Sequence, residues 1–167
     1  MQAEYRARVS MKNPVHFLAL GFGSGLIPVM PGTFGSLAAI PLLLACMYVS
    51  SVSFIALTLI FSVIGIYLCG KTADDMQVHD HGSIVWDEIA GMFVTFLFVP
   101  LSASTLLVGF LLFRVFDILK PWPIGVIDKR LHGGTGIMLD DILAGAMACG
   151  CRHLLMVLWP NSLSFLQ

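Results

Sequence analysis

The chain has 167 residues, of which 57% are hydrophobic and only 11% charged, and its mean hydropathy is +0.90. Soluble domains carry about 25% charged residues, so this composition excludes an ordinary soluble domain and indicates a membrane protein with several spans. A formal net charge of −1 offers no basic surface for a polyanion, so nucleic-acid binding is not expected.

The chain is expected to form a short cytoplasmic tail (1–12), a single membrane-embedded domain (13–160) and a second short tail (161–167). No Asp, Glu, Lys or Arg occurs in residues 13–70. The start of this uncharged stretch, up to residue 27, is apolar but rich in glycine. That pattern favours a re-entrant or interfacial half-helix over a complete span.

Five membrane helices are predicted, at residues 37–49, 54–69, 83–99, 105–120 and 140–159. Residues 28–36 are expected to form a loop, and residues 71–81 a polar surface helix. The predicted fold is therefore all-α, a polytopic bundle of about five transmembrane helices with an N-terminal re-entrant or interfacial segment.

The segment between the last two predicted spans contains strong helix breakers. Pro121 and Pro123 should stop the fourth helix, because proline lacks a backbone donor and its ring clashes with the preceding turn. The glycines Gly133, Gly134 and Gly136 then predict an irregular loop. The fifth helix is expected to begin at Asp140.

Charged residues indicate the orientation of the chain in the membrane. Nearly all lie in residues 1–12, 71–88 and 114–141, and five crossings put these segments on one side of the bilayer. Only Arg152 departs from this pattern among the basic residues. The positive-inside rule makes the charged side cytoplasmic, with the N-terminus inside and the C-terminus outside.

Carboxylates from three predicted helices gather on this cytoplasmic side: Asp87, Glu88, Asp117, Asp140 and Asp141. Capping of helix N-termini would account for an isolated pair. Five together would repel one another unless a cation lay between them, and hard oxygen ligands suit Mg²⁺. The hypothesis is that Glu88, Asp117 and Asp141 hold Mg²⁺, with Asp87 and Asp140 as further ligands or supports.

Cations flank one of these carboxylates. Arg114, Asp117 and Lys120 are spaced by three residues and share one helix face, so the Arg and the Lys could grip a phosphate. For Lys129 and Arg130, orientation in the membrane and lipid headgroup contact are the favoured interpretation.

Two further motifs could contact a phosphate. His79, Asp80 and His81 precede the first carboxylate pair, where a histidine could serve as general acid or phosphate ligand; a solvated loop is the alternative. The sequence PGTFGS at 31–36 could hold a phosphate through backbone N–H groups, or could simply let helices pack closely.

Four blocks of sequence together resemble the phosphatidylglycerophosphatase A family: GFGSGLIPVMPGTFGSLAAIP, HDHGSIVWDEIAG, FRVFDILKPWPI and HGGTGIMLDDILAG. The resemblance runs from about residue 13 to about residue 159. It implies a Mg²⁺-dependent lipid phosphatase of the bacterial inner membrane, which hydrolyses phosphatidylglycerophosphate to phosphatidylglycerol and phosphate. The charged positions that match the family are Asp80, Asp87, Glu88, Arg114, Asp117, Lys120, Asp140 and Asp141.

The sequence thus predicts an enzyme whose partners are the lipid substrate and the bilayer, with its active site on the cytoplasmic face. The expected catalytic residues are Asp87, Glu88, Arg114, Asp117, Lys120 and Asp141. The expected substrate-binding residues are Arg114, Lys120, His79, Asp80 and His81. One alternative is a small transporter or cation-conducting protein, in which carboxylates form an ion path. Another is a transferase acting on a nucleotide-activated lipid, whose characteristic paired-Asp helix is absent from the sequence.

Overall fold

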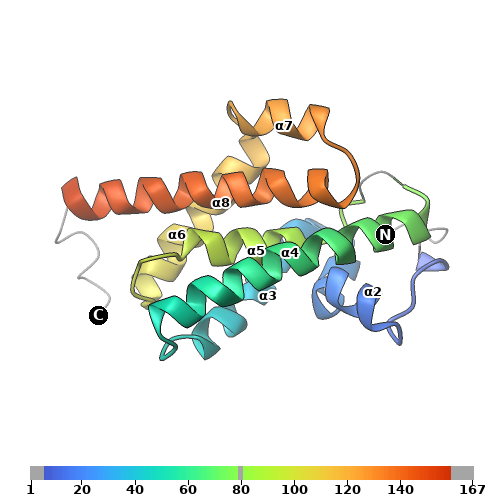
Figure 1. The fold of residues 1–167 in the computed structure, drawn as a ribbon, viewed down its shortest axis with the longest axis horizontal. Helices are drawn as coiled ribbons and strands as arrows, with labels where there is room; N and C mark the ends of the chain where they lie inside the picture. Colours follow the sequence, from blue (N-terminus) through green and yellow to red (C-terminus); the bar gives the residue numbers. More distant parts are fainter. Residues whose placement is uncertain (1–5, 79–80, 159–167) are drawn as a thin grey trace.

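The computed structural model describes residues 6–78 and 81–158, which form helices and contain no strand. This confirms the all-α prediction. The helices, in chain order, are α2 (Pro14–Ala19), the 3₁₀ helix η1 (Gly21–Leu26), α3 (Pro31–Ala45), α4 (Ser51–Met76), α5 (Trp86–Thr95), α6 (Ala103–Leu119), α7 (Ile124–Arg130) and α8 (Gly133–Leu158) (Figure 1).

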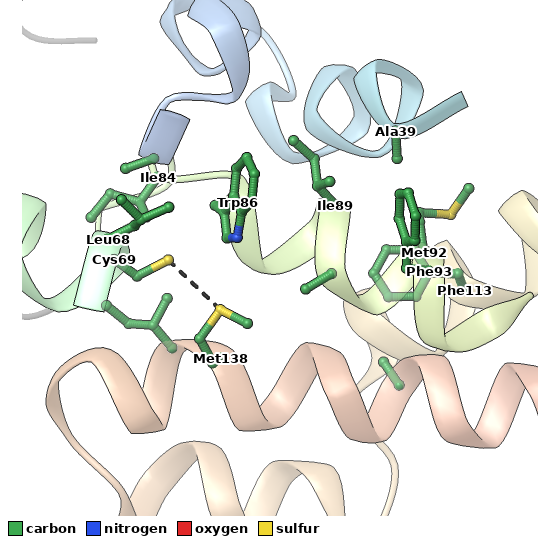
Figure 2. Close-up of a cluster of buried hydrophobic side chains, with 14 of the residues drawn as sticks. Ala39, Leu68, Cys69, Ile84, Trp86, Ile89, Met92, Phe93, Phe113 and Met138 are labelled. Carbon is green, nitrogen blue, oxygen red and sulfur yellow. Dashed lines mark hydrogen bonds between the residues drawn. The ribbon is translucent and has the colours of Figure 1, made fainter. Parts of the chain in front are cut away.

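Helix α5 is the centre of the bundle and packs against α3, α4, α6 and α8. Every residue of α5 except Asp87 is buried. In Figure 2 its side chains Ile89, Met92 and Phe93 lie among residues of the surrounding helices. Phe93 stacks on Phe54 of α4 with ring centroids 5.4 Å apart. After its acidic first turn, α5 is apolar on all sides from Ile89 to Val94, as expected of a helix at such a position.

Glycines allow α5 and α8 to approach closely. A Cβ atom on Gly145 of α8 would lie 2.3 Å from the carbonyl oxygen of Gly91, and one on Gly91 would lie 2.7 Å from the carbonyl oxygen of Asp141. Small residues at such crossings are characteristic of membrane helix packing. This contact brings the first turns of α5 beside the middle of α8.

Helices α4 and α8 run side by side in opposite directions along the molecule (Figure 1). Each has 26 residues, and among the described residues these two are the helices long and apolar enough to cross a membrane. They also touch closely, since a Cβ on Gly134 would lie 1.9 Å from the carbonyl oxygen of Ile66. Between them, Cys69 donates its S–H to the sulfur of Met138 at 3.8 Å, so this cysteine packs as expected for a free thiol (Figure 2).

The other helices of the bundle are shorter. The 15 residues of α3, 17 of α6 and 10 of α5 correspond to about 22, 26 and 15 Å of helix, against about 30 Å of hydrocarbon in a bilayer. Helix length therefore supports two spans and does not confirm about five.

Three predicted boundaries in the first half of the chain are wrong. The expected loop at 28–36 is helical from Pro31 onward, because proline suits the first position of a helix. The expected break near residue 70 is absent, since α4 runs without interruption to Met76. The third predicted helix, 83–99, is reduced to α5, which ends at Thr95.

The second half needs two corrections. Residues 124–130, expected to be irregular, form the short helix α7. The expected glycine loop at 133–136 is the first turn of α8, so Asp140 and Asp141 lie two turns inside that helix rather than at its start. By contrast, α6 ends at Leu119, just before the prolines, as predicted.

The N-terminal segment is broken as its glycines suggest. Helix α2 has six residues, and η1 contains Gly21, Phe22 and Gly23 with φ angles of 55°, 60° and 99°. His16 of α2 is buried, and its Nε2 lies 3.0 Å from Oδ2 of Asp75, which ties α2 to the end of α4.

Candidate active site

Three carboxylates from two helices meet inside the bundle. Asp87 and Glu88 lie in the first turn of α5, and Asp141 lies on the facing side of α8. One carboxylate oxygen of each lies within 4.8 Å of the others. Glu88 and Asp141 are only 9% and 3% exposed, so this group, here named the carboxylate cluster, is largely shielded from solvent.

The position of α5 follows from its first residue. Trp86 is buried, donates its indole N–H to the carbonyl of Phe61 at 3.0 Å, and packs on the Phe61 ring at 5.1 Å. These contacts fix the start of α5 on α4, while the close contact at Gly91 fixes its next turn on α8. Together they hold Glu88 opposite Asp141.

Arg114 of α6 is a cation that lies beside the carboxylate cluster. Its Nη1 donates to Oδ2 of Asp117, and both side chains are 15% exposed. A Cβ added to Gly32 would lie 2.3 Å from Oε1 of Glu88 and 3.2 Å from Nη1 of Arg114. Arg114 and Glu88 therefore converge on the first turn of α3, with Gly32 between them.

Ser36, one turn further along α3, also lies beside Arg114. Its hydroxyl is fully buried, donates to the carbonyl of Gly32 at 2.9 Å, and lies 3.5 Å from Nη1 of Arg114. Residues 31–36 are predicted either to hold a phosphate or to let helices pack closely. The structure places this segment beside the carboxylate cluster as helix.

Lys120 has a different environment from the one expected of a phosphate ligand. Its Nζ donates to Oδ1 of Asp128 and to Oδ2 of Asp140, each at 2.6 Å. Burial disfavours the charged ammonium group, but the two carboxylates outweigh burial and raise the pKa of Lys120 above its ordinary value. Lys120 thus links the end of α6 to α7 and α8.

The two remaining carboxylates of the predicted metal site are paired. Asp117 binds Arg114, although its charge acts on both Glu88 and Asp141. Asp140 binds Lys120, and its other oxygen accepts the backbone N–H of Asp141 at 3.1 Å. Asp87, predicted as a further ligand or support, thus lies in the carboxylate cluster, and Asp117 lies beside Asp141 at its edge. Which of them binds a metal stays a prediction.

Of the three predicted substrate contacts before α5, His79 and Asp80 lie outside the described residues. His81 is partly buried, and its Nδ1 accepts the backbone N–H of Ser83 at 3.2 Å. Two further residues of the site, Asp128 and Gly32, have contacts that the sequence does not predict. Asp128 lies on a helix that was not predicted, and the part played by Gly32 depends on a contact between helices far apart in the sequence.

The donor set suits a hard divalent cation. The three carboxylates of the cluster face each other with Arg114 as the adjacent cation, and Oε2 of Glu88 is buried with no hydrogen-bond partner among the described residues. Buried acidic oxygens without a partner are costly, and a bound cation would offset both the desolvation and the mutual repulsion. Carboxylate oxygens are the ligands that Mg²⁺ prefers.

Comparisons with known proteins point to one family. The family model described as phosphatidylglycerophosphatase A matches residues 17–156. A protein of Escherichia coli named phosphatidylglycerophosphatase A is 47% identical over 156 residues, covering 93% of this chain and 91% of its own. A protein of Haemophilus influenzae with the same name is 50% identical over 143 residues, covering 84% of this chain and 88% of its own.

A more distant relative has a different name. A protein of Bacteroides thetaiotaomicron, provisionally named a phosphatidylinositol-3-phosphatase, is 34% identical over 146 residues, covering 81% of this chain and 91% of its own. No solved structure matches the chain significantly.

Proposed function

Because the chain belongs to the phosphatidylglycerophosphatase A family, we propose that it is a Mg²⁺-dependent lipid phosphatase. Its reaction is the hydrolysis of phosphatidylglycerophosphate to phosphatidylglycerol and inorganic phosphate, a step of phospholipid synthesis. The observation that carries the proposal is the convergence of Asp87, Glu88 and Asp141 beside Arg114 in a shielded part of the bundle.

The residues of the carboxylate cluster would hold the cation, which supplies polarisation of the phosphoryl group and orientation of a water molecule for attack. Arg114 binds phosphoryl oxygens and neutralises the charge that develops on them. Asp117 holds the Arg114 guanidinium in place through their ion pair. Lys120 acts mainly through Asp140, which it positions beside Asp141.

Hydrolysis breaks the bond between phosphorus and the glycerol oxygen, so the leaving alkoxide needs a proton. His79 and His81 are the candidate donors, because they precede α5 directly in the sequence. Water is the proposed nucleophile. Attack by a carboxylate of Asp87 or Asp117, with an aspartyl-phosphate intermediate, is the variant to be distinguished from it.

We also propose that the protein is a multi-pass protein of the bacterial inner membrane, with α3, α4, α5, α6 and α8 as the membrane bundle and the site at its cytoplasmic end. Wide apolar exposure on the outer helices supports this arrangement: Val52, Leu59 and Val63 of α4 are 78%, 60% and 67% exposed. Substrate acyl chains would then remain in the bilayer while the headgroup enters between the helices.

The names of these relatives both refer to a phosphate monoester on a lipid. They differ in the alcohol that carries the phosphate, which is glycerol in one name and inositol in the other. Selectivity is therefore part of the same test. Purified full-length protein in detergent micelles should release phosphate from synthetic phosphatidylglycerophosphate, faster than from phosphatidylinositol 3-phosphate. Absence of release at every Mg²⁺ concentration would refute the proposed reaction.

Metal dependence is tested in the same preparation. Excess EDTA should stop phosphate release and added Mg²⁺ should restore it; Mg²⁺ should also raise the melting temperature of the wild type but not of Asp141→Asn. The matched control is Asp74→Asn, which removes an exposed carboxylate of α4 and should retain both responses. Full activity in excess EDTA would remove the metal from the mechanism.

Cation flux through protein-containing vesicles, at rates above those of empty vesicles, would support the ion-conducting alternative instead.

A further inference from the structure

A groove lies on the outer side of α7, apart from the carboxylate cluster. It has a volume of about 370 Å³ and is lined by Trp122, Gly125, Val126, Lys129 and Arg130. These residues are three or four positions apart, so they share one face of the short helix and the turn before it. We name this surface the α7 groove.

The opposite side of α7 is attached to the protein. Ile124 is fully buried, and Asp128 accepts the ammonium group of Lys120. Figure 1 shows α7 packed along the outside of α8, on the far side from α3 and α4. The α7 groove therefore faces away from the bundle. On the opposite side of α7, Asp128 contacts Lys120, which also binds Asp140.

The α7 groove combines an exposed aromatic ring with two cations. Trp122 is 82% exposed, and neither Lys129 nor Arg130 has a carboxylate within ion-pair distance among the described residues. A tryptophan beside basic side chains is the combination found where a protein meets the polar boundary of a membrane.

Apolar exposure next to the groove indicates how the membrane lies. Ile118 and Leu119, at the end of α6, are 61% and 72% exposed and directly precede the turn that carries Trp122. The surface thus changes within a few residues from apolar side chains to cations. Such a boundary matches the depth at which acyl chains give way to phosphate headgroups.

We propose that the α7 groove binds the phosphodiester headgroup of an anionic phospholipid. Lys129 and Arg130 would contact the phosphate, and Trp122 would lie at the level of the glycerol backbone. The proposal rests on the membrane location given under the proposed function, but it requires no turnover. Charge complementarity selects an anionic over a zwitterionic lipid, because nothing acidic in the groove would receive a choline or ethanolamine group.

The test uses full-length protein reconstituted in vesicles that contain brominated lipids, which quench nearby tryptophans. The contribution of Trp122 is the difference between the wild type and Trp122→Phe. Brominated phosphatidylglycerol should quench this contribution more than brominated phosphatidylcholine at the same mole fraction. The excess should fall at least threefold in the variant Lys129→Gln/Arg130→Gln.

The matched control is Arg6→Gln/Lys12→Gln, which removes two exposed cations from the N-terminal segment and should keep the excess quenching. Equal quenching by both lipids in the wild type, or the same loss in the control as in the groove variant, would overturn the proposal. Phosphate release in detergent, measured separately, should be retained by the groove variant. A protein without phosphatase activity that still shows the selective quenching would refute the proposed function and leave this site standing.

Discussion

Replacing Gly32 by alanine should inactivate the enzyme without unfolding it. The added Cβ would lie 2.3 Å from Oε1 of Glu88, about 1 Å inside an ordinary contact, and 3.2 Å from Arg114. The carboxylate must give way, because the alanine is fixed on the backbone of α3. A displacement of about 1 Å in a catalytic group costs about 100-fold in rate, equivalent to about 2.7 kcal/mol of transition-state stabilisation. The helix itself tolerates alanine.

The measurement is kcat/KM for phosphate release by Gly32→Ala, together with its melting temperature in detergent. Gly150→Ala is the control, since Gly150 also lies in a helix and a Cβ there meets nothing within 4 Å. The control should keep its activity and its stability. Activity within threefold of the wild type in Gly32→Ala would refute the inference that Glu88 works at the first turn of α3.

Three further predictions concern charge and packing. Glu88→Gln and Asp141→Asn should each lower kcat by about 100-fold or more, yet raise the melting temperature in EDTA, because each removes a repelling charge from the carboxylate cluster; unchanged turnover in both would exclude them from the site. Lys120→Met should lower the free energy of unfolding by about 1–2 kcal/mol, since Lys120 is 30% exposed and its loss leaves two carboxylates without their cation. Because the pKa of Lys120 is raised, this difference from wild type should persist from neutral pH up to about pH 10 and vanish as the ammonium group deprotonates above that; a difference that disappears near neutral pH would contradict the assignment. Gly145→Ala should destabilise the protein by about 1–3 kcal/mol, as α8 must move away from α5, and a melting temperature equal to that of the wild type would contradict the close contact.

Much of the fold could be predicted because long apolar stretches separated by charged segments indicate helices in a sequence. The end of α6 was predictable, since Pro121 follows Lys120 directly and Pro123 lies two residues further on. The starts of α3 and α8 were not. Proline and glycine normally indicate loops, but Pro31 occupies the first position of a helix, and Gly134 is required by the backbone of α4 lying against it. Pro31 begins a helix because its fixed φ suits the first position, whereas at Gly134 packing against α4 outweighs the local preference for a loop.

The candidate site, like the fold, could be predicted only in part. Helical spacing correctly paired Arg114 with Asp117. Spacing could not reveal that Lys120 bonds to Asp128 and Asp140, because these carboxylates belong to two other helices. The assignment of individual metal ligands stays a prediction, and the geometry places Asp87 together with Glu88 and Asp141.

The enclosure of α5 has a consequence for biosynthesis. A segment of ten residues with two acids in its first turn is a poor candidate for release into lipid by itself, and its main packing partner α8 is translated about 40 to 60 residues later. At about 5–20 residues per second, the ribosome needs several seconds to deliver that partner. In the proposed membrane arrangement, the middle of the newborn chain would therefore remain incompletely inserted until the last helix is made and packs against it.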